Sequence, residues 1–173
     1  IYIGGGTPSY IDSKYIEEIL EELKSKNIAS NAEITIEVNP GTVTKEKMQE
    51  YKKIGINRIS IGLQTTQNNL LKQIGRIHNF EEFLETYNIT RKTGFKNINV
   101  DLMIGLPNQS IQDIKITLEK IIKLNPEHIS VYSLIVEEKT PIEDKISKGE
   151  LELPDEETER NMYWYVKNTL ELN

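Results

Sequence analysis

The sequence predicts an α/β fold in which parallel strands form one sheet and helices pack outside it. Short runs rich in Ile and Val begin near residues 1, 34, 57, 97 and 128, and segments with helical hydrophobic spacing separate them. These onsets recur at the length of a βα unit, roughly 30 residues. The strands should therefore be parallel, with their carboxyl ends on one rim, where parallel sheets and barrels bind ligands.

Each strand-like run leads into a polar stretch, most of them with Gly or Pro, which marks where the strand ends. The strand-like runs, each followed by its polar stretch, are Ile1–Ile3 and then Gly4–Pro8, Ile34–Ile36 and then Glu37–Pro40, Ile59–Ile61 and then Gly62–Gln64, Ile98–Val100 and then Asp101–Pro107, and His128–Tyr132 and then Ser133. The Ile and Val content is expected of strands covered on both faces by other layers. Element order does not decide between a closing barrel and a doubly wound open sheet.

Five amphipathic helices are expected between and after these strands. Their first residues or caps are, in chain order, Ser13, Thr44, Phe80, Ser110 and Pro154. The first should bury Ile16, Ile19, Leu20 and Leu23, which follow i, i+3, i+4, i+7 spacing. Ser110 and Asp113 form a capping-box pattern. The segment 137–153 is polar and is expected to be a loop.

Composition limits the classes of function. The chain has 173 residues and a net charge of −6, which argues against a nucleic-acid footprint. No apolar stretch approaches the roughly 20 residues that span a bilayer. The chain has no cysteine, which excludes disulfides and thiolate-bound metal within it, and its two histidines are not spaced as a metal site. Because the chain starts inside a strand pattern and without Met, we expect it to be part of a longer protein.

The first polar stretch, Gly4-Gly5-Gly6-Thr7-Pro8, lies between a strand and a helix. Three glycines allow backbone groups to approach a ligand closely, and Thr7 adds a hydroxyl. The alternative is a flexible turn, since neither G-x-G-x-x-G nor a Walker motif is present.

Three further strand ends carry side chains suited to binding. Glu37 and Asp101 are carboxylates in apolar surroundings, and a buried carboxylate is costly unless it is paired or hydrogen-bonded. They could accept hydrogen bonds from a diol or an ammonium, or serve as structural partners for a loop amide or an Arg. Together with Gln64 on the same rim, they favour a binding site. Arg76 is suited to capturing a carboxylate, although a surface position is the commoner fate of Arg.

Taken together, six strings resemble the radical S-adenosylmethionine (SAM) proteins of the oxygen-independent coproporphyrinogen III oxidase-like group. The strings lie in register from residue 1 to about residue 170, and the haem chaperone branch of the group is the better match. They are Ile3–Ser9, Ile36–Thr42, Arg58–Gln64, Gly75–His78, Asn99–Pro107 and Pro126–Leu134.

The resemblance implies that residues 1–173 form a partial (β/α)6 TIM-like barrel of the radical SAM type, with SAM across its carboxyl-end rim. In the family, the residues matching Gly5, Gly6 and Thr7 meet the methionyl amine, and the one matching Glu37 contacts SAM. Gln64 and Asp101 match residues near the ribose, and Arg76 matches the arginine facing the carboxylate. Ile135 matches an adenine-side backbone contact. No catalytic residue and no metal ligand is assigned within this chain.

The sequence differs from the family at the site of the iron–sulfur cluster. The family holds a 4Fe-4S cluster on three cysteines in a loop after its first strand, and both that strand and that loop are missing here, as is the carboxyl-terminal domain. The resemblance implies that the full-length protein binds the cluster and cleaves SAM to a 5′-deoxyadenosyl radical, whereas this segment alone should be inactive.

The remaining expectations concern partners. The resemblance implies porphyrin or haem as substrate or cargo, an electron donor such as flavodoxin or ferredoxin, no nucleic acid, no transmembrane segment and a cytoplasmic location. Oxidase-type decarboxylation of propionates and haem transfer both stay open. The competing interpretation is an unrelated (β/α) phosphate- or nucleotide-binding enzyme that uses the Gly-rich loop and would hold an anion at the helix near Ser13.

Overall fold

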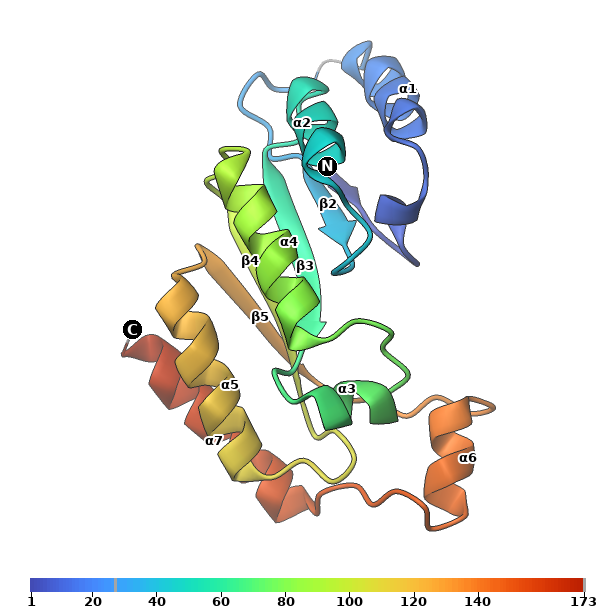
Figure 1. Cartoon of the computed structure of the whole chain (residues 1–173), viewed down its shortest axis with the longest axis vertical. Helices are drawn as coiled ribbons and strands as arrows, with labels where there is room; N and C mark the ends of the chain where they lie inside the picture. The colour runs from blue at the N-terminus through green and yellow to red at the C-terminus, as the bar shows by residue number, and fades with distance from the viewer. Residues whose placement is uncertain (27, 173) are drawn as a thin grey trace.

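A computed structural model describes residues 1–26 and 28–172. Its centre is one five-stranded sheet with the strand order β1-β2-β3-β4-β5, and every neighbouring pair is parallel. Figure 1 shows the strands running with their carboxyl ends toward α3 and α6. The strands are β1 (Tyr2–Ile3), β2 (Thr35–Val38), β3 (Arg58–Gln64), β4 (Ile98–Ile104) and β5 (His128–Ser133). The predicted parallel sheet, with strands in chain order, is confirmed.

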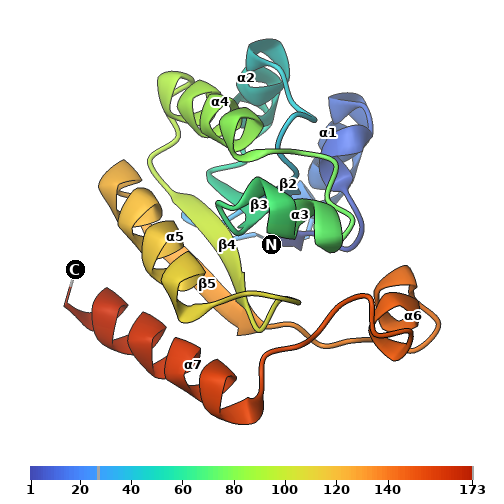
Figure 2. The same ribbon diagram turned by 60° about the horizontal axis from the view of Figure 1, so that its bottom comes forward.

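The longer helices lie along the outside of a curved sheet, as Figure 2 shows, whereas α3 and α6 lie near the carboxyl-end rim. This arrangement settles the question that element order left open, in favour of a partial barrel. The helical segments are η1 (Pro8–Tyr10), α1 (Ser13–Lys24), α2 (Lys45–Lys53), α3 (Asn68–Gln73), α4 (Phe80–Lys92), α5 (Ile111–Leu124), α6 (Pro141–Ser147) and α7 (Glu156–Glu171).

The two faces of the sheet differ sharply in polarity. In β3, Ile59, Ile61 and Leu63 are 0% exposed and belong to the core against the helices. Ser60 and Gln64 alternate with them and therefore lie on the opposite, inner face. The same alternation recurs along β2, β4 and β5. The interpretation of the Ile and Val content as a sign of strands covered on both faces by other layers is thus wrong, because helices cover only the outer face.

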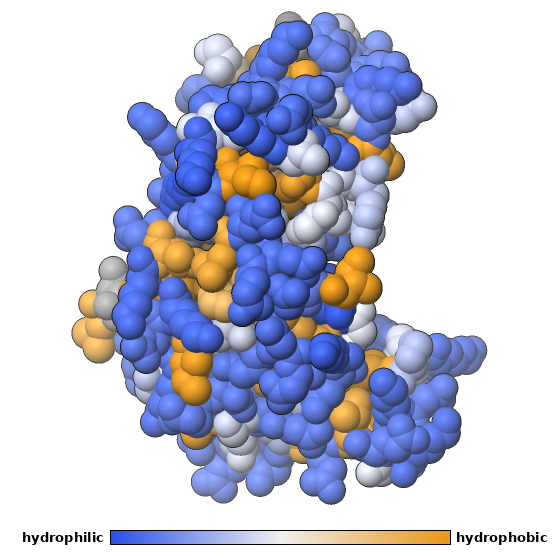
Figure 3. All heavy atoms as spheres, viewed as in Figure 1, coloured by the Kyte–Doolittle hydropathy of each residue, from blue (hydrophilic) through white to orange (hydrophobic). Residues whose placement is uncertain are grey.

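The core lies between the outer face of the sheet and the helices. It joins strand residues to helix residues such as Leu20, Met48 and Phe83, which are buried. On their solvent side the helices present a mostly hydrophilic surface, with apolar atoms visible in gaps between them (Figure 3). Burial of apolar strand and helix faces is therefore the main force holding this layer together.

Helix boundaries follow the expected caps with a few differences. Thr44 caps α2, and Ser110 with Asp113 forms the predicted capping box of α5. The cap of α1 is Asp12 instead of Ser13, since its carboxylate accepts a hydrogen bond from the backbone of Lys14.

Two expectations about helices are wrong. Ile19 is 49% exposed, although its spacing placed it on the buried face of α1. The segment expected to be a loop contains α6, which starts at Pro141 and is capped by Thr140. This helix has no buried residue, so hydrophobic periodicity, the signal used to find the other helices, does not reveal it.

Candidate functional site

A cleft opens at the carboxyl-end rim, on the inner face of the sheet. Its walls come from the Gly-rich loop after β1, the ends of β2, β3, β4 and β5, and the loop after α3. The lining residues are Gly6, Thr7, Pro8, Glu37, Val38, Asn39, Ser60, Gly62, Gln64, Arg76, Asp101 and Tyr132. Most of these side chains are polar, so the cleft is suited to a hydrophilic ligand.

The Gly-rich loop is held in place by the loop after β2. Gly5 and Gly6 have φ of 80° and 82°, a left-handed conformation that favours glycine. The Asn39 side-chain amide donates to Thr7 Oγ1 at 3.1 Å, and the Asn39 backbone N–H donates to Ser9 Oγ at 3.3 Å. Ser9 is fully buried. The loop is therefore an ordered element, against the alternative of a flexible turn.

Glu37 is fixed by two donors from the neighbouring strand and its loop. Tyr2 Oη donates to Glu37 Oε1 at 2.9 Å, and the Gly5 backbone N–H donates to Oε2 at 3.2 Å. Burial and the hydrogen bond to Glu37 raise the pKa of Tyr2, which keeps its hydroxyl a donor. Glu37 thus keeps free lone pairs on a carboxylate whose position is set.

Gln64 ends β3 in an unusual backbone conformation. It is 2% exposed, and its φ of 76° coincides with a register shift between β3 and β4. Tyr132 Oη donates to Gln64 Oε1 at 3.1 Å. Burial and the nearby Asp101 carboxylate raise the pKa of Tyr132, so this hydroxyl stays protonated. Tyr132 uses one lone pair of Oε1, and Gln64 keeps its Nε2 donors for a ligand.

Two neutral side chains donate hydrogen bonds to the carboxylate of Asp101 on β4. Ser60 Oγ donates to its Oδ2 at 2.9 Å, and Asn99 Nδ2 donates to its Oδ1 at 2.7 Å. A carboxylate offers about four lone-pair positions, so each oxygen keeps capacity for a further donor. This arrangement suits a ligand with two adjacent hydroxyl groups.

Arg76 follows α3 and reaches the cleft from the side. Its backbone N–H donates to the Leu71 carbonyl, which continues the turn after the helix. Among the described residues, its guanidinium makes no hydrogen bond or ion pair, and it is the only cationic side chain lining the cleft. The nearby His78 is buried, and burial lowers its pKa, so Arg76 is the cation available to a ligand anion.

The structure brings together most of the residues that the sequence singled out. Gly6, Thr7, Glu37, Gln64, Arg76 and Asp101 line one cleft, and Gly5 contacts Glu37 behind it. Ile135 does not line the cleft and is 77% exposed.

Three polar side chains that line the cleft were missed by the sequence analysis, namely Asn39, Ser60 and Tyr132. Ser60 and Tyr132 belong to the strand alternation that places polar residues on the inner face, and that pattern could have identified them. Asn39 had no comparable signal, because its role depends on contact with the Gly-rich loop.

Metal binding has no support within the described residues. No group of three His, Asp or Glu side chains could hold a metal ion there, and the sequence has no cysteine. An iron–sulfur cluster therefore does not fit the residues of this chain. No helix in the described part of the chain is long and apolar enough to cross a membrane.

Comparison with known proteins identifies similar sequences and structures. Residues 1–121 match the family model of the radical SAM superfamily. The chain is 37% identical over 173 residues to the heme chaperone HemW of Bacillus subtilis strain 168, covering 99% of this chain and 46% of that protein. It is 46% identical over 157 residues to HemW of Buchnera aphidicola subsp. Schizaphis graminum, covering 90% of this chain and 40% of the relative. The chain thus spans less than half the length of these relatives.

A similar solved structure is the coproporphyrinogen III oxidase HemN from Escherichia coli, a radical SAM enzyme. Its TM-score is 0.82 at 26% identity, covering 99% of this chain and 39% of that one. The archaeal Elp3 of Methanocaldococcus infernus has the same fold, with a TM-score of 0.81 at 23% identity, covering 95% of this chain and 43% of that one.

Proposed function

The chain belongs to the radical SAM superfamily, and from this premise we propose that its rim cleft binds SAM within a larger protein of haem or porphyrin metabolism. The observation that carries the proposal is the distribution of charge in the cleft. One unpaired cation, Arg76, and two oriented carboxylates, Glu37 and Asp101, face the same space. SAM carries a carboxylate, an ammonium and a ribose diol, which these groups complement.

In this proposal, different residues bind different groups of SAM. Arg76 meets the carboxylate, because a guanidinium binds carboxylates with charge-assisted hydrogen bonds. The Gly5–Thr7 backbone and Glu37 face the methionyl amine, and Asp101 accepts from the ribose hydroxyls. Gln64 lines the same cleft as Asp101, and its amide N–H groups donate to the ribose oxygens. Ile135 is proposed as the adenine-side backbone contact.

We extend the proposal to the radical chemistry of the full-length protein. SAM and a 4Fe-4S cluster together supply radical chemistry, and the cluster requires ligands outside this chain. What this chain contributes is binding and orientation of SAM. Its rim residues fix the cofactor, and the buried inner-face residues Thr35, Ser60 and Asn99 exclude bulk water from one side.

The competing phosphate-binding interpretation is not favoured. The helix after the Gly-rich loop would have to offer free backbone N–H groups to an anion. Instead, the carboxylate of Asp12 caps α1, and the short η1 separates the loop from that helix. A carboxylate at this helix end repels an incoming phosphate.

Haem handling is the proposed role of the full-length protein, because the relatives with 37% and 46% identity are heme chaperones. Oxidative decarboxylation of porphyrinogen propionates is the second candidate, favoured by the structural similarity to HemN. We also propose a cytoplasmic location and an electron donor such as flavodoxin or ferredoxin.

The test uses the full-length protein reconstituted with iron and sulfide. We expect it to bind SAM by calorimetry and, with a reductant, to form 5′-deoxyadenosine. Haem titration followed by its absorbance, and decarboxylation of coproporphyrinogen, separate the chaperone from the oxidase. The isolated 173-residue segment should show no iron-dependent absorbance, since it has no thiolate ligands. Failure of the reconstituted protein to bind SAM would refute the proposed function.

A further inference from the structure

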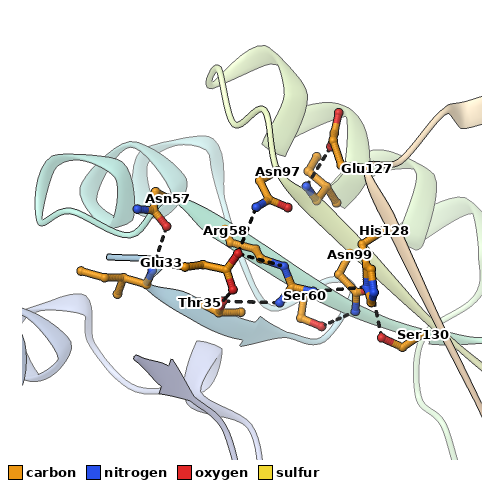
Figure 4. A network of polar contacts seen from close by, with 12 residues as sticks. Glu33, Thr35, Asn57, Arg58, Ser60, Asn97, Asn99, Glu127, His128 and Ser130 are labelled. Atoms are coloured by element: carbon orange, nitrogen blue, oxygen red, sulfur yellow. Dashed lines mark hydrogen bonds and ion pairs between the residues drawn. The ribbon is translucent and has the colours of Figure 1, made fainter. Parts of the chain in front are cut away.

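Below the cleft, a hydrogen-bonded network runs across the inner face of the sheet (Figure 4). Asn99 lies at its centre and is 1% exposed. The strand register places Asn99 beside Ser60 of β3 and His128 of β5. The network therefore connects Asp101, at the floor of the cleft, with residues nearer the amino ends of the strands.

The contacts of Asn99 fix which way its amide points. Its Nδ2 group donates to Asp101 Oδ1 at 2.7 Å and to Ser60 Oγ at 2.8 Å. Ser60 uses its own proton to donate to Asp101 Oδ2 at 2.9 Å. A flipped amide would place an oxygen against the Asp101 carboxylate and lose both donors. Only one amide orientation satisfies these partners.

The oxygen of Asn99 in turn fixes the tautomer of His128. Asn99 Oδ1 accepts from Ser130 Oγ at 3.0 Å and lies 2.5 Å from His128 Nδ1. Since Oδ1 cannot donate, the proton is on Nδ1. Arg58 Nη2 lies 3.3 Å from the same nitrogen, and its N–H cannot also be accepted there. Arg58 instead donates to Thr35 Oγ1 at 3.4 Å and lies near the Glu33 carboxylate.

We propose that Asn99 is a positioning residue for the SAM site, holding the Asp101 carboxylate so that its remaining lone pairs face the ribose diol. The inference rests on the proposed function for its ligand, and it goes beyond that function by assigning a role to a residue outside the cleft. Asn99 does not line the cleft and acts only through Asp101. Ser60 supports it from the adjacent strand, and His128 keeps its amide from flipping.

The decisive variant is Asn99→Asp in the full-length protein. It preserves size but replaces the N–H donors with an oxygen against Asp101. Two touching carboxylates do not both ionise readily, so the pair retains a proton to higher pH and titrates as a unit. A retained proton restores one donor between them. We therefore expect SAM affinity to fall about tenfold or more near pH 8, and the loss to shrink toward about pH 6.

The control is Asn88→Asp on the exposed face of α4, which makes the same charge change away from the cleft. It should follow the wild-type pH profile, because the charged and titratable side chains facing residue 99, which are Asp101, His128 and Arg58, are the same in both proteins. The double variant Asn99→Asp with Asp101→Asn restores one carboxylate and one amide between the two positions. It should recover thermal stability near pH 8 even though the ribose-binding carboxylate is lost.

Measurements without SAM separate this inference from the proposed function. The melting temperature of unliganded Asn99→Asp should rise, relative to Asn88→Asp, as the pH is lowered from about 8 to about 6. Wild-type protein that binds no SAM would refute the proposed function, while this stability profile would still test the contact between residues 99 and 101. Wild-type SAM affinity and an unchanged stability profile in Asn99→Asp would overturn the inference.

Discussion

The two faces of β3 and β4 consist of alternate residues of the same strands, yet the two faces have different roles. On the outer face, Ile59, Ile61 and Val100 are 0% exposed and pack against helices. On the inner face, Ser60, Asn99 and Asp101 bond to one another and lead up to the cleft. Apolar burial dominates folding free energy, whereas hydrogen bonds contribute less but in defined directions. The outer face therefore supplies stability and the inner face supplies orientation.

Because adjacent residues of a strand face opposite sides of the sheet, substitutions at neighbouring positions should have different effects. Outer-face variants should change stability with little direct effect on the ligand. Variants of rim side chains that have no hydrogen-bond partner among the described residues should change SAM affinity with little effect on stability. Measuring both quantities for the same variant is the way to test the comparison.

The largest expected effect is on the outer face. Ile61→Ala should reduce the free energy of unfolding by about 2–5 kcal/mol, because it leaves a cavity in the core. Urea denaturation of the full-length protein measures this loss. Ile19→Ala is the matched control, since Ile19 is 49% exposed and its truncation should cost about 0.5 kcal/mol or less. Equal losses at the two positions would contradict the assigned core.

Next in size is Arg76→Ala at the rim. It removes the one cation lining the cleft in the described chain, and SAM affinity should fall by on the order of 1.5–3 kcal/mol. Stability should change little, because the guanidinium forms no hydrogen bond or ion pair with the residues that the structure describes. Calorimetric titration with SAM measures the affinity. Arg160→Ala, at an exposed position on α7, should bind SAM like the wild type.

Asp101→Asn should weaken SAM binding less than Arg76→Ala. An amide retains one acceptor oxygen for the ribose hydroxyls, although its NH2 group would face donors from Ser60 or Asn99. The same titration compares the two variants, with the exposed Asp144→Asn as control. If Asp101→Asn abolished binding and Arg76→Ala left it unchanged, the proposed orientation of the ligand would be wrong.

The smallest expected effect is a pH dependence from His78. Its ring is buried and donates from Nε2 to the Leu63 carbonyl at 3.3 Å, and burial lowers its pKa. The unfolded chain keeps the ordinary value of about 6.5, so below that pH it binds more protons than the native state. Stability should therefore be full above about pH 6.5 and fall as the pH drops below it.

His78→Gln keeps a donor for the Leu63 carbonyl but does not titrate. This variant should lose the His78 part of the pH dependence, measured as the melting temperature between about pH 7.5 and pH 5.5. A profile that matches the wild type would show that His78 is not responsible.

The sequence by itself determined the order of elements and the residues at the strand ends. Ile-rich runs at βα spacing identified all five strands, and Thr44 and Ser110 marked helix starts. These signals are local, since periodicity and capping depend on neighbours a few residues away. Position at a strand end was enough to select Glu37, Gln64 and Asp101 for the cleft, because parallel strands bring such ends to one rim.

Only the tertiary structure decided which partners those side chains have. That Tyr132 orients Gln64, that Asn39 holds Thr7, and that Asn99 supports Asp101 follow from strand register and loop contact. The curvature of the sheet, which leaves its inner face free of helices, likewise depends on how all five units pack. Such contacts join residues far apart along the chain, and hydrophobic periodicity contains no information about them. The sequence therefore indicates where the residues suited to ligand binding lie, and the tertiary contacts decide which of their atoms remain free to bind.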